Sequence, residues 1–183
     1  MDIVQLREKQ LPDEQLVERA ALVQRVCADH HVPFILNDRP DLAAAIGADG
    51  VHVGQQDVPP EMARRIMGDQ ATIGLSTHAP TELAAAIGGP APVDYVSAGP
   101  VTPTPTKPGR AGTGLGYVGE AVSRAPWPVW VTGGVDPTTV ANMVAAGARH
   151  FVVVRWLTEA RDPAGAARVM RQTIDELIGQ SLS

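Results

Sequence analysis

The sequence predicts an α/β fold of the TIM (β/α)8-barrel type, with seven of the eight β/α units present in this chain. Short β-branched runs alternate with helical patterns throughout the 183 residues, which is typical of βαβ units and a parallel sheet. A unit of helix, glycine and strand recurs at 43–51, 84–96 and 144–152. No glycine-rich dinucleotide fingerprint supports an open sheet. We therefore expect one barrel domain over residues 1–183.

Composition excludes several classes of protein. The 44% hydrophobic content supports a sizeable core, whereas a net charge of −5 and 4% aromatic residues argue against a nucleic-acid binder. The single cysteine, Cys27, excludes a disulfide framework within the chain and favours the reducing cytoplasm. No apolar run approaches the ~18–20 residues of a membrane span, and the N-terminus is not a signal peptide.

The expected elements follow one another along the whole chain. We predict strands at Ile3–Leu6, Phe34–Leu36, Gly50–Val53, Thr72–Leu75, Tyr95–Ala98, Val129–Thr132 and His150–Val154. Helices are predicted at Asp13–His30, Pro40–Ile46, Pro60–Met67, Ala79–Ile87, Leu115–Arg124, Pro137–Ala146 and Pro163–Ile178. Several begin with proline in the first turn, where its missing N–H costs nothing. Because a closed barrel needs eight strands, either one strand lies upstream or the barrel is open on one side.

Polar side chains gather where the predicted strands end, which is where barrels of this kind place their chemistry. They include the cations Arg7, Lys9 and Lys107, the carboxylates Asp38 and Asp57, and the amides and hydroxyls Gln5, Asn37, Ser76, Thr104 and Thr106. Carboxylates beside cations suggest Mg²⁺ shared with a phosphate, because Mg²⁺ takes one or two carboxylates plus substrate oxygens. The Gly133-Gly134 turn offers backbone N–H groups to a second phosphate. Each residue also has a plainer interpretation as a helix cap, a turn or a solvated charge.

The longest predicted loop, 102–114, follows the fifth strand and combines prolines, threonines and glycines with two cations. Such a segment cannot form a core, and long loops in compact domains often carry function. Its hydroxyls, with Lys107 and Arg110, predict an anion clamp. Two anionic groups, one metal ion and no obvious nucleophile then imply a group transfer driven by loss of a stabilised leaving group.

Six collinear motifs together resemble the thiamine-phosphate synthase family. They are Gln5-Leu6-Arg7-Glu8-Lys9, Phe34-Ile35-Leu36-Asn37-Asp38, 48–57 (Ala-Asp-Gly-Val-His-Val-Gly-Gln-Gln-Asp), Ile73-Gly74-Leu75-Ser76-Thr77-His78, Pro103-Thr104-Pro105-Thr106-Lys107 and Gly133-Gly134-Val135. The resemblance implies an enzyme that joins 4-amino-2-methyl-5-hydroxymethylpyrimidine diphosphate to 4-methyl-5-(2-phosphoethyl)thiazole, giving thiamine monophosphate and diphosphate. It also implies that the diphosphate departs first and leaves a pyrimidine-stabilised carbocation.

The same resemblance assigns roles to single residues. It implies Mg²⁺ as the cofactor, held by Asp38 and Asp57. The residues implied to bind the substrates are Gln5, Arg7, Lys9, Asn37, Ser76, Thr104, Thr106, Lys107 and Gly134, with Lys107, Ser76 and Arg7 catalytic. Arg155 departs from the family pattern after the last strand. It either supplies the thiazole phosphate with a bidentate partner or points outward.

Some expectations concern the chain as a whole. The family has one more strand and helix before the Gln5 motif, so we expect this chain to lack them at its N-terminus. An open sheet edge would favour association into homo-oligomers. Two rival functions are a thiazole tautomerase of the same family, which His78 would suit, and a non-catalytic phosphate-ligand-binding regulatory protein. The retained Asp38 and Asp57 favour the metal-dependent transferase, because an isomerase has no diphosphate to hold.

Overall fold

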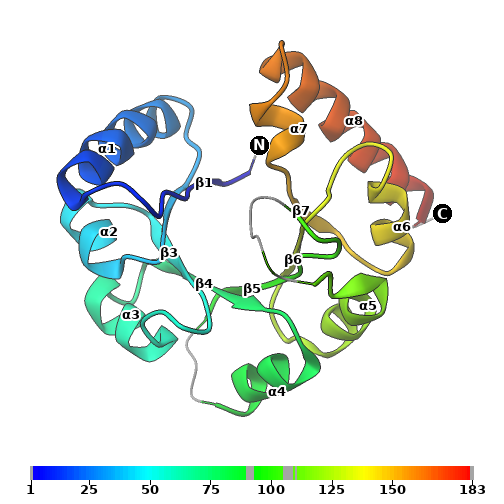
Figure 1. The fold of residues 1–183 in the computed structure, drawn as a ribbon, viewed down its shortest axis with the longest axis horizontal. Coiled ribbons are helices and arrows are strands. Elements are labelled where there is room, and N and C mark those ends of the chain that lie inside the picture. Colours follow the sequence, from blue (N-terminus) through cyan, green and yellow to red (C-terminus); the bar gives the residue numbers. More distant parts are fainter. Residues whose placement is uncertain (1, 90–92, 105–108, 110, 182–183) are drawn as a thin grey trace. The chain divides into compact units, whose positions relative to one another are not determined.

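The computed structural model describes residues 2–89, 93–104, 109 and 111–181. Strands and helices alternate along this part of the chain (Figure 1). The chain divides into two compact units, which are Met1–Ser76 with Gly89–Asp94 and Thr77–Gly88 with Tyr95–Ser183. The boundary between the units falls inside the fourth strand, immediately after Ser76.

In its described part, the first unit contains four parallel strands and three helices. Its strands are β1 (Val4–Leu6), β2 (Phe34–Asn37), β3 (Gly50–Val53) and β4 (Thr72–Thr77, whose last residue belongs to the second unit). Each strand pairs in parallel with the next one along the chain. The helices are α1 (Asp13–Asp29), α2 (Pro40–Ile46) and α3 (Pro60–Met67). Helices α2 and α3 start on proline, as predicted.

Every residue of strands β2 and β3 is buried, and apart from Asn37 and His52 these residues are apolar or glycine. Parallel strands with both faces covered lose the alternation of apolar and polar residues, and they read as continuous apolar runs. The core of this unit accordingly consists of large side chains with at most 1% exposure, namely Phe34, Ile35, Leu36, Val51, Val53 and Ile73.

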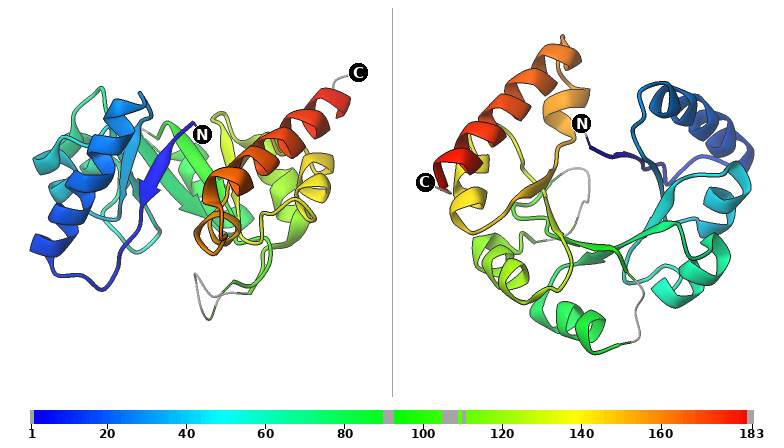
Figure 2. Two further views of the ribbon diagram at one scale, coloured as in Figure 1. Left: turned by 90° about the horizontal axis from the view of Figure 1, so that it is seen from above. Right: turned by 180° about the vertical axis from the view of Figure 1, so that it is seen from behind.

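The second unit contains three parallel strands and five helices in its described part. The strands are β5 (Tyr95–Ala98), β6 (Val129–Thr132) and β7 (His150–Val152), paired in that order. The helices are α4 (Pro80–Gly88), α5 (Gly114–Arg124), α6 (Val140–Ala145), α7 (Arg155–Thr158) and α8 (Pro163–Ser181). The long helix α8 packs against α6 and α7 (Figure 2). Its buried Met170 joins Val118, Val131, Val140 and Met143 in one core cluster.

The structure confirms the predicted alternation and corrects the bounds of several elements. Helix α6 begins at Val140 instead of Pro137, because residues 136–139 form a hydrogen-bonded turn around Asp136. Strand β7 ends at Val152 instead of Val154, and the short helix α7 that follows was not predicted. A helix of only four residues, such as α7, is too short for hydrophobic periodicity to indicate it in the sequence. No described helix combines the length and apolarity that a membrane crossing requires.

Candidate active site

Two carboxylates and one ammonium come together in the first unit, after strands β1, β2 and β3. The Nζ of Lys9 lies 2.7 Å from Oδ2 of Asp38. Asp57 is the second carboxylate, and its Oδ2 accepts a 2.8 Å hydrogen bond from the backbone N of Gly54. Burial raises the pKa of Asp38 above its usual range, and the neighbouring Asp57 raises it further, whereas Lys9 lowers it. The structure thus brings together three side chains that the sequence placed at strand ends, and their roles toward metal and substrate stay predictions.

Asp38 has a backbone conformation that few residues other than glycine adopt. Its φ is +68°, and its N–H donates to the carbonyl of His52 on β3 at 2.8 Å. Aspartate tolerates the left-handed region better than most residues do, but the conformation still has a cost. Such backbone conformations often occur at functional sites, where the surrounding structure holds them. At Asp38 this conformation places a carboxylate at the end of a buried strand.

The two carboxylates are ligands that Mg²⁺ accepts, but they are too few to complete its coordination by protein groups alone. Across the described residues, no three His, Cys, Asp or Glu side chains gather as a metal site. Mg²⁺, however, is commonly bound through one or two carboxylates together with substrate oxygens and water. Two neighbouring carboxylates, one with a raised pKa, present the oxygen ligands that a hard cation prefers.

Ser76 and Asn37 are buried polar residues of the same unit, with exposed fractions of 5% and 8%. The side-chain Nε2 of Gln55 donates to the carbonyl of Ser76 at 2.6 Å. The Nε2 of His52 lies 2.9 Å from the Ser76 hydroxyl. Sequence reasoning did not single out Gln55 or His52 as site residues. The available signal was a histidine within a strand whose other residues are small or apolar.

Two predicted residues of the first unit are not drawn into this hydrogen-bond network. Gln5 is exposed on β1, and Arg7 is partly exposed just after β1. Within the described part of the chain, neither side chain makes a hydrogen bond or ion pair to the other predicted site residues. Their predicted roles toward the diphosphate and the pyrimidine remain predictions.

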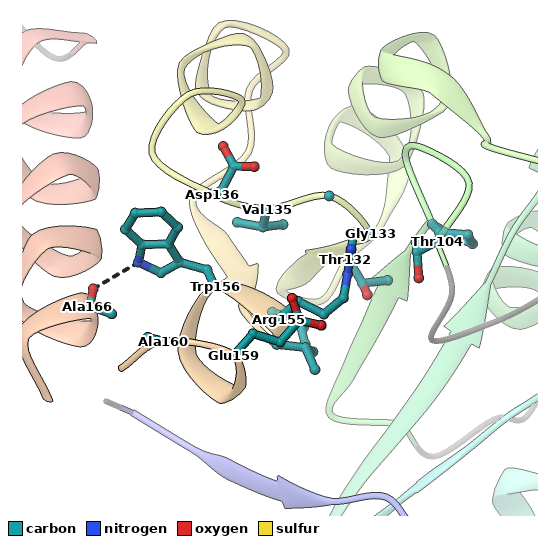
Figure 3. Close-up of a pocket in the computed structure, with 14 residues that line it drawn as sticks. Thr104, Thr132, Gly133, Val135, Asp136, Arg155, Trp156, Glu159, Ala160 and Ala166 are labelled. Atoms are coloured by element: carbon teal, nitrogen blue, oxygen red, sulfur yellow. Dashed lines mark hydrogen bonds between the residues drawn. The ribbon is translucent and has the colours of Figure 1, made fainter. Parts of the chain in front are cut away.

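A pocket of about 430 Å³ lies in the second unit, between the turn after β6 and helices α7 and α8. Its lining combines predicted site residues with others that were not predicted (Figure 3). The predicted ones are Thr104, Gly133, Gly134 and Arg155, whereas Asp136, Trp156 and Glu159 were not predicted. In Figure 3 the Arg155 side chain extends toward Gly133, while the indole of Trp156 donates to the carbonyl of Ala166 at 3.0 Å.

The Gly133-Gly134 turn requires glycine at both positions. Their φ angles are +93° and +76°, in the left-handed region that side chains disfavour. A Cβ at Gly133 would lie 2.4 Å from Cβ of Pro100, and one at Gly134 would lie 2.3 Å from Oγ1 of Thr102. Without side chains, the turn can bring backbone N–H groups close to a ligand in the pocket.

Side chains that follow the turn hold it in place. The hydroxyl of Thr139 donates to the carbonyl of Gly134 at 2.6 Å. Asp136 accepts hydrogen bonds from the backbone N of Thr138 and of Thr139, at 2.8 and 3.1 Å. The hydroxyl of Thr138 lowers the pKa of Asp136 most strongly, and these two backbone N–H groups lower it further. The turn is thus tied to the start of α6.

The remaining predictions concern the loop after β5 and the histidine after β4. Thr106 and Lys107 lie outside the described residues. The two ends of the loop are joined, because the N of Thr113 donates to the carbonyl of Pro100 at 2.8 Å. His78, which the tautomerase alternative would use, is paired through Nδ1 with the carboxylate of Glu82 at 2.9 Å.

Comparison with known proteins identifies the family and confirms the predicted fold class. The family model described as thiamine monophosphate synthase matches residues 1–157. A thiamine-phosphate synthase of Thermus thermophilus is 46% identical over 180 residues, which cover 95% of this chain and 83% of that protein. One of Thermobifida fusca is 42% identical over 175 residues, covering 95% of this chain and 80% of its own length.

The structural comparison agrees with the sequence comparison. The solved structure of a thiamine phosphate pyrophosphorylase from Pyrococcus furiosus superimposes with a TM-score of 0.85 at 27% identity, covering 95% of this chain and 83% of that one. The fold is accordingly α/β of the TIM-barrel type, with seven β/α units in the described part of this chain. The chain belongs to the thiamine monophosphate synthase family.

Proposed function

We propose that the chain is a thiamine-phosphate synthase, a transferase that joins the pyrimidine diphosphate to the thiazole phosphate and releases diphosphate. The observation that supports the proposal is that, in a chain of this family, each unit gathers groups whose chemistry suits anion binding. The first unit holds Lys9 with the Asp38–Asp57 pair. The second unit holds the Gly133-Gly134 turn in a pocket with Arg155. A reaction between two phosphorylated substrates needs both sets.

Asp38 and Asp57 would hold Mg²⁺. When bound, the ion supplies positive charge to the diphosphate oxygens. Lys9 and Arg7 add two further positive charges, and Asn37 and Ser76 provide neutral hydrogen-bond donors. In the second unit, Thr104, Gly134 and Arg155 bind the thiazole phosphate. Thr106 and Lys107 keep the roles that the family resemblance implies, at the thiazole phosphate and the diphosphate.

The chemistry proposed for this site needs no protein nucleophile. The bond between the pyrimidine methylene carbon and the diphosphate oxygen breaks first, and the electron pair leaves with the diphosphate. The thiazole nitrogen then donates its lone pair to the carbocation and forms the new C–N bond. Groups aimed at the growing negative charge of the diphosphate lower the barrier, because their interaction is stronger in the transition state than in the substrate.

Turnover of both substrates by the purified protein tests this function. With Mg²⁺ present, we expect equal amounts of diphosphate and thiamine monophosphate, and no product when either substrate or the metal is withheld. Asp57→Ala should lower kcat/KM on the order of 100-fold or more, as loss of an electrostatic group at the reacting centre does. Asp69→Ala, at an exposed position, is the matched control.

Three results would contradict the assignment. Isomerisation of a thiazole carboxylate phosphate without diphosphate release would favour the tautomerase alternative. Binding of both substrates without turnover would favour a regulatory protein. Full activity of Asp57→Ala would show that Asp57 serves only to hold the backbone of Gly54.

A further inference from the structure

The short helix α7 carries Arg155, the cation proposed to bind the thiazole phosphate, but little within α7 itself holds that helix in place. It has four residues, far fewer than the roughly 12–15 that an isolated helix needs to be even marginally stable in water. Its N-cap residue, Val154, makes no side-chain capping hydrogen bond. The position of α7, and with it the direction of Arg155, must therefore be fixed by contacts outside the helix.

Trp156 of α7 supplies such a contact. Its indole Nε1 donates a 3.0 Å hydrogen bond to the carbonyl of Ala166, ten residues further along the chain in α8 (Figure 3). Helix α8 is 19 residues long, and its buried Met170 belongs to the core cluster of the second unit. The hydrogen bond thus ties a short helix to a long one that the core already holds.

The place of Trp156 directly after Arg155 explains why this anchor matters for the pocket. Successive residues of an α-helix are rotated by about 100° around its axis, because one turn takes about 3.6 residues. The two side chains therefore project in different directions, and in Figure 3 the indole extends toward Ala166 while Arg155 extends toward Gly133. Both residues line the same pocket. By fixing the rotation of α7 about its axis, Trp156 also sets the direction of Arg155.

The guanidinium of Arg155 has no other support among the residues that the structure describes. It is exposed, and it forms no ion pair or hydrogen bond with any of them. An arginine that binds a phosphate through two parallel N–H groups needs a defined orientation, and ordering a free side chain at the moment of binding lowers the affinity. A residue that orients the backbone of Arg155 beforehand should therefore strengthen binding.

We propose that Trp156 is a positioning residue: through its hydrogen bond to α8, it holds α7 in the orientation in which Arg155 faces Gly133 and binds the phosphate of the thiazole substrate. This inference rests on the proposed function. The thiazole phosphate group takes no part in bond breaking, so its binding contributes equally to the ground state and to the transition state. Loss of the Trp156 hydrogen bond should accordingly raise KM for the thiazole phosphate and leave kcat unchanged.

A double-mutant cycle with Arg155 tests the proposal. Trp156→Phe keeps an aromatic ring but removes the N–H donor. We expect it to raise KM for the thiazole phosphate roughly 3- to 10-fold, the range for one lost hydrogen bond, with kcat within about 2-fold of the wild type. In the Arg155→Ala background, the same substitution should change KM less than about 2-fold. An equal rise in both backgrounds, or no rise beside the native Arg155, would show that Trp156 does not act through Arg155.

A competing interpretation is that the indole stacks directly on the thiazole ring, because Trp156 also lines the pocket. Phenylalanine would preserve such stacking, whereas leucine would abolish it. Anchoring predicts instead that Trp156→Phe and Trp156→Leu raise KM by similar factors, since both lack the N–H. A normal KM in Trp156→Phe together with a raised KM in Trp156→Leu would overturn the proposal.

Trp127→Phe is the matched control for these variants. Trp127 lies just before β6, whereas the pocket is lined by Thr132 at the other end of that strand, so KM should stay unchanged. Nitrogen-15 spectra of tryptophan-labelled protein give a readout that does not depend on activity. The indole N–H of Trp156, assigned by its absence from Trp156→Phe, should be protected from hydrogen exchange. Immediate exchange would show that the bond to Ala166 does not hold α7 in solution.

Direct binding separates this inference from the proposed function. Isothermal titration calorimetry with the thiazole phosphate measures its dissociation constant without turnover, and Trp156→Phe should raise that constant by the same factor as KM. A wild-type protein that forms no thiamine monophosphate rejects the function, whatever the variants do. A wild-type protein that turns over normally, with an unchanged dissociation constant in Trp156→Phe, rejects only the role of Trp156. Circular dichroism of every variant checks that the fold is retained in each comparison.

Discussion

At the scale of single residues, Asp38 combines features that oppose stability. It is a non-glycine residue at φ +68°, its carboxyl is partly buried, and a second carboxylate adjoins it. Burial and a like charge both disfavour the ionised form, which is why its pKa is raised. The Lys9 ammonium offsets only part of this. A side chain chosen for stability would carry no charge at this position.

Replacing Asp38 with asparagine tests whether the charge of Asp38 lowers stability while it supports catalysis. Asparagine tolerates the left-handed conformation as well as aspartate does, but it removes the buried negative charge. We expect the free energy of unfolding of the metal-free protein to be equal to or higher than that of the wild type. The catalytic rate should fall on the order of 100-fold. Chemical denaturation and steady-state kinetics measure the two quantities.

Asp41→Asn is the matched control for this experiment. Asp41 is also an aspartate in the segment after β2, in the first turn of α2, but its carboxylate pairs with the partly buried Arg39 instead of facing another carboxylate. It should keep full activity. A marked loss of stability in Asp38→Asn, with activity retained, would show that Asp38 has a structural role.

The site residues were partly predictable at this scale. Lys9, Asp38 and Asp57 were recognisable because charged residues at successive strand ends must meet at one edge of a parallel sheet. His52 was not, because a histidine in a buried strand indicates core as readily as function. Its link to the candidate site is the 2.9 Å contact with Ser76, 24 positions away in sequence. No local pattern encodes that contact.

At the scale of elements, two of the three recurring units of helix, glycine and strand share one hydrogen bond. Asp49, just before β3, accepts a 2.7 Å hydrogen bond from the backbone N of Phe34 at the start of β2. Asp94, just before β5, does the same for the backbone N of Ile73 in β4. Each aspartate immediately precedes a strand and satisfies a backbone donor of an earlier strand. In both cases, a buried N–H that would otherwise lack a partner is satisfied.

The turn after β6 leads to a second prediction at this scale. Asp136→Asn should weaken the hydrogen bonds to the backbone of Thr138 and Thr139, and so loosen the Gly134 turn. We expect a loss of about 1 kcal/mol in the free energy of unfolding at neutral pH, typical of a lost capping carboxylate. KM for the thiazole phosphate should rise, because the turn lines the pocket proposed for that phosphate.

The pH dependence of this effect has a definite sign. The folded-state pKa of Asp136 lies below its ordinary value, so its ionised form stabilises the fold. That contribution is complete above the unfolded-state pKa and is lost as the pH falls through the folded-state pKa. The difference in stability between wild type and Asp136→Asn should therefore shrink in acid. A difference that grows in acid would contradict this account.

Asp162→Asn provides a matched control for Asp136→Asn. Asp162 accepts a 2.9 Å hydrogen bond from the backbone N of Gly165 at the start of α8, but it does not line the pocket. Its loss should also lower the free energy of unfolding, without raising KM for the thiazole phosphate. A rise in KM with both variants would show that stability alone controls KM.

At the scale of the whole molecule, we expect bound anions to stabilise the folded chain although its net charge is −5. The reason is that cations of the candidate site lie in both units. Lys9 and Arg7 belong to the first unit, and Arg155 belongs to the second. Because ligands that bind only the folded state stabilise it, diphosphate with Mg²⁺ should raise Tm. At about 100 times its dissociation constant, a ligand adds about 2.7 kcal/mol to the free energy of unfolding.

The comparison that matters is between metal and chelator. Diphosphate with Mg²⁺ should raise Tm more than diphosphate with EDTA, and Asp57→Ala should remove the difference. Equal shifts with metal and chelator would show that the carboxylate pair does not recruit the ion. Differential scanning fluorimetry measures these shifts without requiring turnover. Association into oligomers and a cytoplasmic location stay predictions.

The sequence by itself determined the fold class, the family and the order of every described element except α7. Alternating apolar periodicity, glycine stops and polar residues at strand ends are local signals, and each can be interpreted without knowing what lies next to it in space. It also indicated most of the candidate residues, because parallel strands deliver their carboxyl ends to a common edge.

Only the tertiary structure decided which contacts those residues make. It paired His52 with Ser76, placed Asp38 in a left-handed conformation, and added Trp156 and Glu159 to the pocket with Arg155. These features depend on contacts between residues far apart in the chain, or on a backbone angle that neighbouring strands impose. Local sequence propensity does not specify these contacts and angles, because they arise only when separate elements pack together.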